Sequence, residues 1–173
     1  MRYARALGSV FSRIFDASGR ILLVLNVAAE KTIVKDGRKQ PMHKPRSFGL
    51  PGGGNRLDET PFRTARRELW EEGGIKATFI PYGIFIPPRD DPTDLENAGK
   101  AFYDGFDPVG EATAENDPEN GVEAVYWATR EEVEKGVIDY NGEAIPIYSN
   151  HRKAILNIPH RIPVPGWEAN ATQ

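Results

Sequence analysis

The apolar positions of this chain form short runs that predict mainly strands. Residues 9–15 and 20–27 are rich in large aliphatic and aromatic side chains, and the Asp-Ala-Ser-Gly segment at 16–19 between them is a hairpin signal. Further strands are predicted over residues 47–50, 100–106 and 122–127, with one or two more inside 75–86. Several short strands joined by polar turns favour a fold built around a β-sheet.

The clearest helix signal lies between Thr60 and Gly74. Thr60 suits an N-cap, and Pro61 suits the first helical position, where its missing N–H costs nothing. The pair Gly73-Gly74 supplies a stop. An apolar stripe at helical spacing predicts that this helix packs on a sheet; it consists of Phe62, Ala65 and Leu69.

Two further helices are expected near the C-terminus. Thr129 would cap a short helix over residues 131–135, which Gly136 would end, and an amphipathic helix is predicted to begin near Pro146. After Pro159 the remaining prolines indicate irregular structure. We therefore expect one domain over residues 1–160 and an irregular tail over 161–173.

The predicted central helix carries three carboxylates on one face. At 100° per residue, Glu68, Glu71 and Glu72 lie within about 100° of one another. Such like charges repel by roughly 0.2–0.5 kcal/mol per pair, so the arrangement favours a bound hard cation. Arg67 lies one turn before Glu71, where it would orient a carboxylate and offset part of the repulsion.

Three consecutive glycines, Gly52 to Gly54, follow the predicted strand at 47–50. Glycine lets the backbone approach a ligand closely, although a triple glycine alone is better interpreted as a flexible turn. Its position directly before the acidic helix favours a ligand-binding loop.

Taken together, the glycines and the acidic helix resemble the Nudix box, the signature of the Nudix hydrolases. The pattern is matched without departure at nine positions, namely Gly53, Glu59, Arg67, Glu68, Leu69, Glu71, Glu72, Gly74 and Ile75. This resemblance implies an α/β fold (α+β in some schemes), with a central mixed β-sheet in a Nudix-type α/β/α sandwich.

The resemblance also implies roles for individual residues. Metal ions, Mg²⁺ or Mn²⁺, would be held by Glu68 and Glu72, often with Glu71 and with the backbone carbonyl of Gly52. Glu71, Glu72 and Arg67 are the candidate catalytic residues, with Arg67 as an orienting partner. Gly53 and Glu59 are structural positions of the box. The general base stays open between a box glutamate and a glutamate from a later loop.

Composition narrows the class of protein. The chain has 173 residues, 39% of them apolar and 27% charged, which suits a globular domain with its own core. It has no cysteine, which excludes disulfides and a thiolate nucleophile. The longest apolar run, within residues 21–29, is too short to span a bilayer, so we expect a cytoplasmic protein.

Charge is unevenly distributed. Residues 28–46 hold six basic residues against two acids, and we expect a basic loop there, either solvated or helping to neutralise a polyphosphate. Arg46, at its end, is a candidate phosphate-binding residue. Glu123 is a candidate additional acid near the metals. Other loop acids that could serve as base or ligand are Glu111, Glu115 and Glu119.

The remaining candidates are weaker. The three histidines are isolated, and no zinc-site spacing links them. Four aromatic residues could stack on a nucleobase or belong to the core, namely Phe48, Tyr82, Phe85 and Tyr103.

The expected chemistry is hydrolysis of a diphosphate bond in a nucleoside diphosphate linked to another moiety, by water that a metal activates. Alternatives are a non-catalytic Nudix-fold binding or regulatory module and an RNA-end pyrophosphohydrolase. An isopentenyl-diphosphate isomerase usually relies on a cysteine, which this chain lacks. The expected partner is a small nucleotide or other diphosphate. An RNA end and a homodimer stay open, whereas membrane and DNA are not expected.

Overall fold

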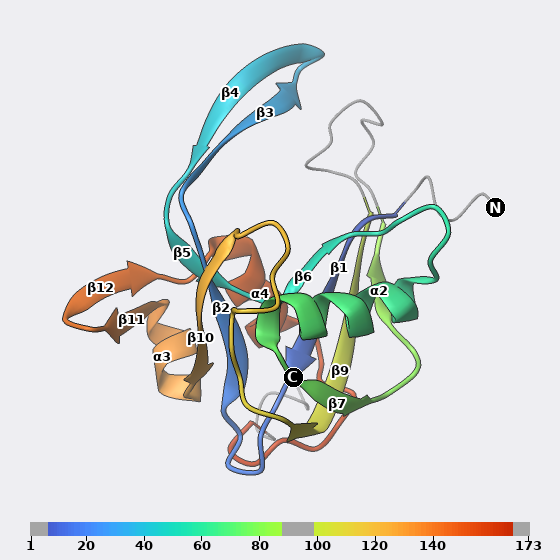
Figure 1. Cartoon of the computed structure of the whole chain (residues 1–173), viewed down its shortest axis with the longest axis vertical. Helices are drawn as coiled ribbons and strands as arrows, with labels where there is room; N and C mark the ends of the chain where they lie inside the picture. The colour runs from blue at the N-terminus through green and yellow to red at the C-terminus, as the bar shows by residue number, and fades with distance from the viewer. Residues whose placement is uncertain (1–6, 88–98, 168–173) are drawn as a thin grey trace.

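The computed structural model describes residues 7–87 and 99–167, and two β-sheets form its centre (Figure 1). Their strands are β1 (Leu7–Ile14), β2 (Ile21–Asn26), β5 (Ser47–Gly49), β6 (Gly52–Gly54), β7 (Lys76–Phe79), β8 (Ile84–Ile86), β9 (Gly99–Val109) and β10 (Val122–Ala128). The larger sheet has the order β6-β1-β9-β7, with β8 also paired to β9, and the smaller has the order β10-β2-β5. Because β1 runs parallel to β9 while the other pairs in these sheets are antiparallel, the predicted mixed α/β architecture is confirmed.

Helices cover both faces of the sheets. They are α2 (Pro61–Glu68), which continues into the π-helical turn η1 (Leu69–Gly73), α3 (Arg130–Lys135) and α4 (Ser149–Asn157). Val10 of β1 packs beneath α2 with Ala65, whereas its neighbour Phe11 packs on the opposite side, where Ile155 of α4 lies. Successive strand residues point to opposite faces, so α2 and α4 lie on opposite sides of β1. In the described part of the chain no helix is both long and apolar enough to cross a membrane.

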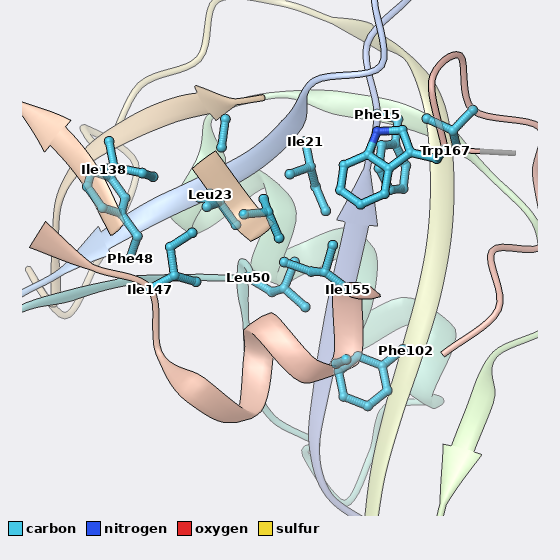
Figure 2. Packing of buried hydrophobic residues seen from close by; sticks show 14 of the residues in the cluster. Phe15, Ile21, Leu23, Phe48, Leu50, Phe102, Ile138, Ile147, Ile155 and Trp167 are labelled. Atoms are coloured by element: carbon cyan, nitrogen blue, oxygen red, sulfur yellow. The ribbon is translucent and has the colours of Figure 1, made fainter. Parts of the chain in front are cut away.

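Strand β2 is buried on both faces, which explains its uninterrupted apolar sequence. Leu23 and Leu25 belong to the main core, while Leu22 packs with Leu69 of η1 on the other side. Figure 2 shows the main core, with Leu23 and Leu50 near Ile155 of α4.

The predicted hairpin between β1 and β2 is wrong. Asp16 and Gly19 do form a tight turn, in which Gly19 N–H donates to the Asp16 carbonyl at 3.1 Å. Beyond the single bridge between Phe15 and Ile21, however, the two strands separate into different sheets. Pairing of β1 with β6 and β9 uses both of its edges and leaves none for β2.

The predicted basic loop is instead a β-hairpin. β3 (Ala29–Lys35) pairs with β4 (Arg38–Lys44), and the two extend away from the rest of the molecule (Figure 1). Asp36 and Gly37 connect them with φ values of 52° and 71°, as a type I′ turn requires. The Asp-Gly pair was the overlooked sequence signal.

A second unpredicted hairpin joins β11 (Val137–Tyr140) to β12 (Glu143–Pro146), here through an Asn-Gly turn at 141–142. Thr129 caps α3 as predicted, with Gly136 at its end. The last predicted helix, α4, begins at Ser149 rather than near Pro146, because β12 extends to that proline.

Residues 161–167, the described part of the predicted irregular tail, contain no helix or strand but are part of the core. Ile162, Val164 and Trp167 are buried, and the Trp167 indole N–H donates to the Gly19 carbonyl at 2.8 Å. Figure 2 shows Trp167 beside Phe15, with 5.6 Å between the ring centroids. Residues 161–167 therefore close one end of the sheets.

A buried ion pair attaches this segment and α4 to the larger sheet. Arg13 of β1 forms two hydrogen bonds with Asp104 of β9, at 2.6 and 2.8 Å. Its guanidinium also donates to the carbonyls of Ala154, Ile158 and Pro159, which satisfies acceptors at the end of α4. Neither side chain is more than 1% exposed.

Candidate functional site

The helix that carries the site begins and ends where the sequence predicts. The Thr60 hydroxyl accepts from the Arg63 N–H at 3.2 Å, Pro61 occupies the first turn, and Gly74 ends the helical stretch with φ of 72°. A Cβ at Gly74 would also meet the backbone of Thr113, so glycine is required there for space as well.

The last turn, η1, is π-helical, so a projection at 100° per residue is only approximate after Leu69. Glu68 and Glu71 still lie close together, because one nitrogen of the Arg67 guanidinium donates to both, at 2.8 and 3.0 Å. Glu68 and Glu72 also approach the glycine strand β6. π-Helical turns inside α-helices occur frequently at functional sites.

The three glycines are a strand rather than a flexible turn. β6 pairs with β1, and the Gly52 N–H donates to the Glu72 carboxylate at 2.9 Å. A Cβ at Gly53 would lie 2.6 Å from a Glu68 carboxylate oxygen, whereas one at Gly54 would meet nothing closer than 4.0 Å. The absence of a side chain at Gly53 is therefore what lets the Glu68 carboxylate approach this strand.

Arg67 organises the carboxylates around it. It forms two hydrogen bonds with Glu59, at 2.7 and 3.0 Å, and one with Glu68 at 2.8 Å, besides its contact with Glu71. The hydroxyl of Thr64 also donates to Glu59. The Arg67 hydrogen bonds are the main cause that lowers the pKa of Glu59. Arg67 thus lies where the orienting role predicts.

Glu72 is a carboxylate in an unfavourable place for negative charge. Burial raises its pKa to about 8, the Gly52 N–H opposes this shift, and the nearby Glu68 adds to it. Burial also raises the pKa of Glu68, against the effect of Arg67. Among the described residues, no Lys or Arg forms an ion pair with Glu72.

The donor set fits a hard divalent cation only in part. Glu68, Glu72 and the carbonyl of Gly52 offer the oxygen ligands that Mg²⁺ and Mn²⁺ prefer, and the raised pKa of Glu72 shows a carboxylate that a cation would stabilise. Within residues 7–87 and 99–167, however, no three acidic or histidine side chains already form a metal-binding cluster. Arg67 holds the third expected ligand, Glu71, in the present arrangement.

A groove of about 840 Å³ opens beside Glu72 and β6. The hairpin β3–β4 and helix α4 supply much of its other lining, including Lys44, Tyr148 and His151. The Lys44 ammonium lies 5.0 Å from the centroid of the Tyr148 ring. Burial and the neighbouring Lys31 lower the pKa of Lys44, while Glu72 opposes that shift. The groove therefore combines the Glu72 carboxylate with lysines from β3, β4, β9 and α4.

Two candidates lie outside this groove lining. Arg46 pairs with Glu123 of β10 and with Glu143 of β12, the latter at 2.7 Å. The predicted phosphate-binding role of Arg46 and the predicted role of Glu123 near the metals stay predictions, and each would require this ion-pair cluster to open.

The loop after β9 does approach the box. Thr113 N–H donates to the Gly73 carbonyl at 3.0 Å, which fixes the loop against η1. The charge of Glu119 contributes to the raised pKa of Glu68, and that of Asp117 contributes to the raised pKa of Glu72. Asp117 was not among the sequence candidates, which in this loop were glutamates.

The aromatic and histidine candidates differ in how deeply they are buried. Phe48 and Tyr103 are buried, whereas Tyr82 and Phe85 are 70% and 57% exposed. His151, considered isolated from the sequence, is buried in α4 beside the groove. A histidine spaced with Ala154 and Ile155 on the apolar face of the predicted helix was the available signal.

Comparison with known families matches the chain to the NUDIX domain over residues 8–150. No curated protein matches it in a sequence search.

Several solved structures share the fold. The MutT NUDIX hydrolase from Burkholderia pseudomallei is similar with a TM-score of 0.54 and 20% identity, over 88% of this chain and 98% of that one. The NUDIX domain of Shewanella oneidensis NrtR, crystallised with ADP ribose, has a TM-score of 0.52 and 18% identity, over 86% and 82%. A bifunctional NMN adenylyltransferase/ADP ribose pyrophosphatase from Francisella tularensis, complexed with AMP and a Mn ion, has a TM-score of 0.55 and 16% identity, over 86% and 39%.

Proposed function

We propose that this chain, which belongs to the Nudix hydrolase family, cleaves a diphosphate bond in a nucleoside diphosphate linked to another moiety, with the help of a divalent metal ion. The observation that carries this proposal is the position of Glu72. Its carboxylate has no ion-pair partner among the described residues, it contacts the Gly52 N–H, and it lines a groove large enough for a nucleotide.

Mg²⁺ or Mn²⁺ would be held by Glu68, Glu72 and the carbonyl of Gly52. When bound, such an ion supplies positive charge against the phosphate oxygens and makes water more acidic. Glu71 is retained as a predicted ligand and catalytic carboxylate, which requires exchange of its bond to Arg67. Arg67 itself is a positioning residue, because it holds Glu59, Glu68 and Glu71 in fixed relative positions.

The chain's own residues supply the rest of the chemistry. The Gly52 N–H fixes the orientation of the Glu72 carboxylate before a substrate arrives. Lys44, which lines the same groove, would attract the diphosphate and place it against the box. Together with the metal ion it would oppose the negative charge of the diphosphate, which reduces the repulsion that an attacking oxygen meets.

The test is a hydrolysis panel with Mg²⁺ and with Mn²⁺. ADP ribose is the first compound, because the NUDIX domain of NrtR was crystallised with it. Nucleotide sugars, dinucleoside polyphosphates, nucleoside triphosphates and 5′-triphosphate RNA complete the panel. We expect Glu72→Gln to lose at least a hundredfold in rate on any compound cleaved. Glu131→Gln, on the exposed face of α3, is the matched control and should keep the wild-type rate.

Failure of wild-type protein to cleave any compound, with binding retained, would favour a ligand-binding or regulatory module. Cleavage of RNA alone would favour the RNA-end alternative. A cytoplasmic location and a homodimer stay predictions.

A further inference from the structure

His151 occupies a special position between the core and the groove. It is only 6% exposed, and its Nδ1 accepts a hydrogen bond from the Leu50 N–H at 2.9 Å. Its ring contacts Phe11 edge-on with 4.4 Å between centroids and Tyr148 with 5.1 Å. A Cβ at Gly49 would lie 2.7 Å from Nδ1, so glycine there is what allows the imidazole to approach the strand.

These contacts determine which nitrogen of the His151 imidazole carries the proton. Because Nδ1 accepts from a backbone N–H, the single proton of the neutral imidazole must be on Nε2. Burial, assisted by the charges of Lys44, Lys100 and Lys31, lowers the pKa of His151 to about 3, so the ring is neutral near pH 7. The Nε2–H is then a permanent donor whose direction the Leu50 contact fixes.

That donor has no acceptor among the described residues. With Nδ1 turned to Leu50, the opposite edge of the ring is the one left to the groove, which His151 lines together with Gly52, Glu72 and Lys44. Among the described residues, the Ser47 hydroxyl is the one buried side-chain polar atom without a partner, so the Nε2–H of His151 is open to solvent, and a ligand acceptor in the groove can replace water there.

We infer that His151 is a substrate-binding residue whose Nε2–H donates to a non-bridging phosphate oxygen of the diphosphate. The inference rests on the proposed function and deepens it. A phosphate oxygen is the acceptor favoured by the surroundings, because Lys31, Lys44 and Lys153 line the same groove and would attract an anion. The lysines provide charge, while His151 provides a fixed direction.

Two substitutions separate the binding role from a structural one. In His151→Asn, the amide oxygen takes the place of Nδ1 and can still accept from Leu50, but the donor toward the groove is lost. In His151→Gln, the longer amide places an N–H near the position of Nε2. His43→Asn is the control, because His43 is exposed on β4 and is not among the groove-lining residues.

The experiment is calorimetric binding of α,β-methylene-ADP, a non-hydrolysable diphosphate, in Mg²⁺ buffer, with Tm measured for each variant. We expect His151→Asn to bind roughly 10- to 100-fold more weakly at a nearly unchanged Tm, and His151→Gln to stay within about threefold of wild type. In wild type, the Nε2–H proton resonance should move downfield when the ligand binds.

Equal binding by His151→Asn and wild type, or an unmoved Nε2–H resonance at saturation, would overturn the inference. Loss of binding by both variants in proportion to a lowered Tm would make His151 purely structural. These results leave the hydrolysis panel unaffected, so the inference can fail while the proposed function holds. Wild-type protein that neither binds this ligand nor hydrolyses the panel would overturn both.

Discussion

The carboxylate of Glu72 and the backbone N–H of Gly52 meet at 2.9 Å, which joins the end of the box helix to the glycine strand. Twenty residues separate the two along the chain. Glu72 lies in the π-helical turn η1 and Gly52 is the first residue of β6. A single hydrogen bond thus places a buried carboxylate at the edge of a groove.

The raised pKa of Glu72 makes the stability of the metal-free protein depend on pH. Its folded pKa of about 8 lies above the ordinary value of 4.5, so the folded state binds more protons between these values. The contribution of protonated Glu72 to the free energy of unfolding is present at low pH and is lost as pH rises through 8. We expect the Tm without metal to fall by roughly 3–10 °C between pH 6.5 and 9, relative to Glu72→Gln.

The comparison with Glu72→Gln is needed because the pKa of Glu68 is also raised and that of Lys44 is lowered. His151, with a lowered pKa of about 3, gains its stabilising neutral form between pH 3 and 6.5, so its contribution is complete before the window begins. Mg²⁺ should reverse the slope, because it binds the deprotonated carboxylate. Thermal melts with EDTA and with Mg²⁺ are the measurement, and a metal-free Tm that rises above pH 6.5 relative to Glu72→Gln would contradict the assignment.

Substitutions at Gly53 and Gly54 form a matched pair that tests whether Glu68 needs the space left by a missing side chain. Alanine at 53 would place its Cβ 2.6 Å from the Glu68 carboxylate, whereas alanine at 54 meets only the Gly8 carbonyl at 4.0 Å. We expect Gly53→Ala to weaken Mn²⁺ binding roughly 10- to 100-fold by displacing Glu68, and Gly54→Ala to change it little. Mn²⁺ titration of both variants is the test, and equal affinities would show that Glu68 does not need this space.

Arg67 and Arg66 are neighbours with different tasks. Arg67 is largely buried among Glu59, Glu68 and Glu71, while Arg66 is exposed. Arg67→Ala leaves three carboxylates without their shared cation, so we expect a loss of about 2–4 kcal/mol in the free energy of unfolding and weaker metal binding. Arg66→Ala should cost less than about 0.5 kcal/mol. Urea unfolding compares the two, and similar losses would remove Arg67 from its positioning role.

The buried pair of Arg13 and Asp104 should be the most sensitive polar contact in the core. Arg13→Met strands the Asp104 carboxylate and leaves three carbonyls at the end of α4 without their donor, so we expect a loss of about 3–5 kcal/mol. Arg20→Ala, which removes an exposed pair with Asp16, should cost less than about 1 kcal/mol. Urea unfolding of both variants measures this difference; comparable losses would show that the buried pair does not hold α4.

The sequence predicts the box helix well because its signals are local. The Thr60 cap and the positive φ of Gly74 act within one turn of these residues, so both can be recognised from the local sequence. The same holds for Thr129 and Gly136 at α3. The Asp36-Gly37 hairpin was equally readable, and the basic composition of the segment hid it.

Contacts between residues far apart in the chain could not be predicted from the sequence. The separation of β1 from β2 follows from the parallel pairing of β1 with β9, about ninety residues later, which no local pattern encodes. The buried partner of Arg13 lies at the same distance, in β9. Within the site, the sequence identifies the three carboxylates, but it does not predict the π-helical turn or the hydrogen bond between Glu72 and Gly52. His151 enters the groove only through the packing of α4.

The central claim is that Glu72 at β6 binds a divalent cation. The most direct measurement is electron paramagnetic resonance of free Mn²⁺ during titration of metal-free wild-type protein and Glu72→Gln at pH 8. We predict that wild-type protein removes the free-ion signal up to a stoichiometric end point, while Glu72→Gln binds at least tenfold more weakly. Identical titration curves for the two proteins, or no uptake by wild type, would contradict the account.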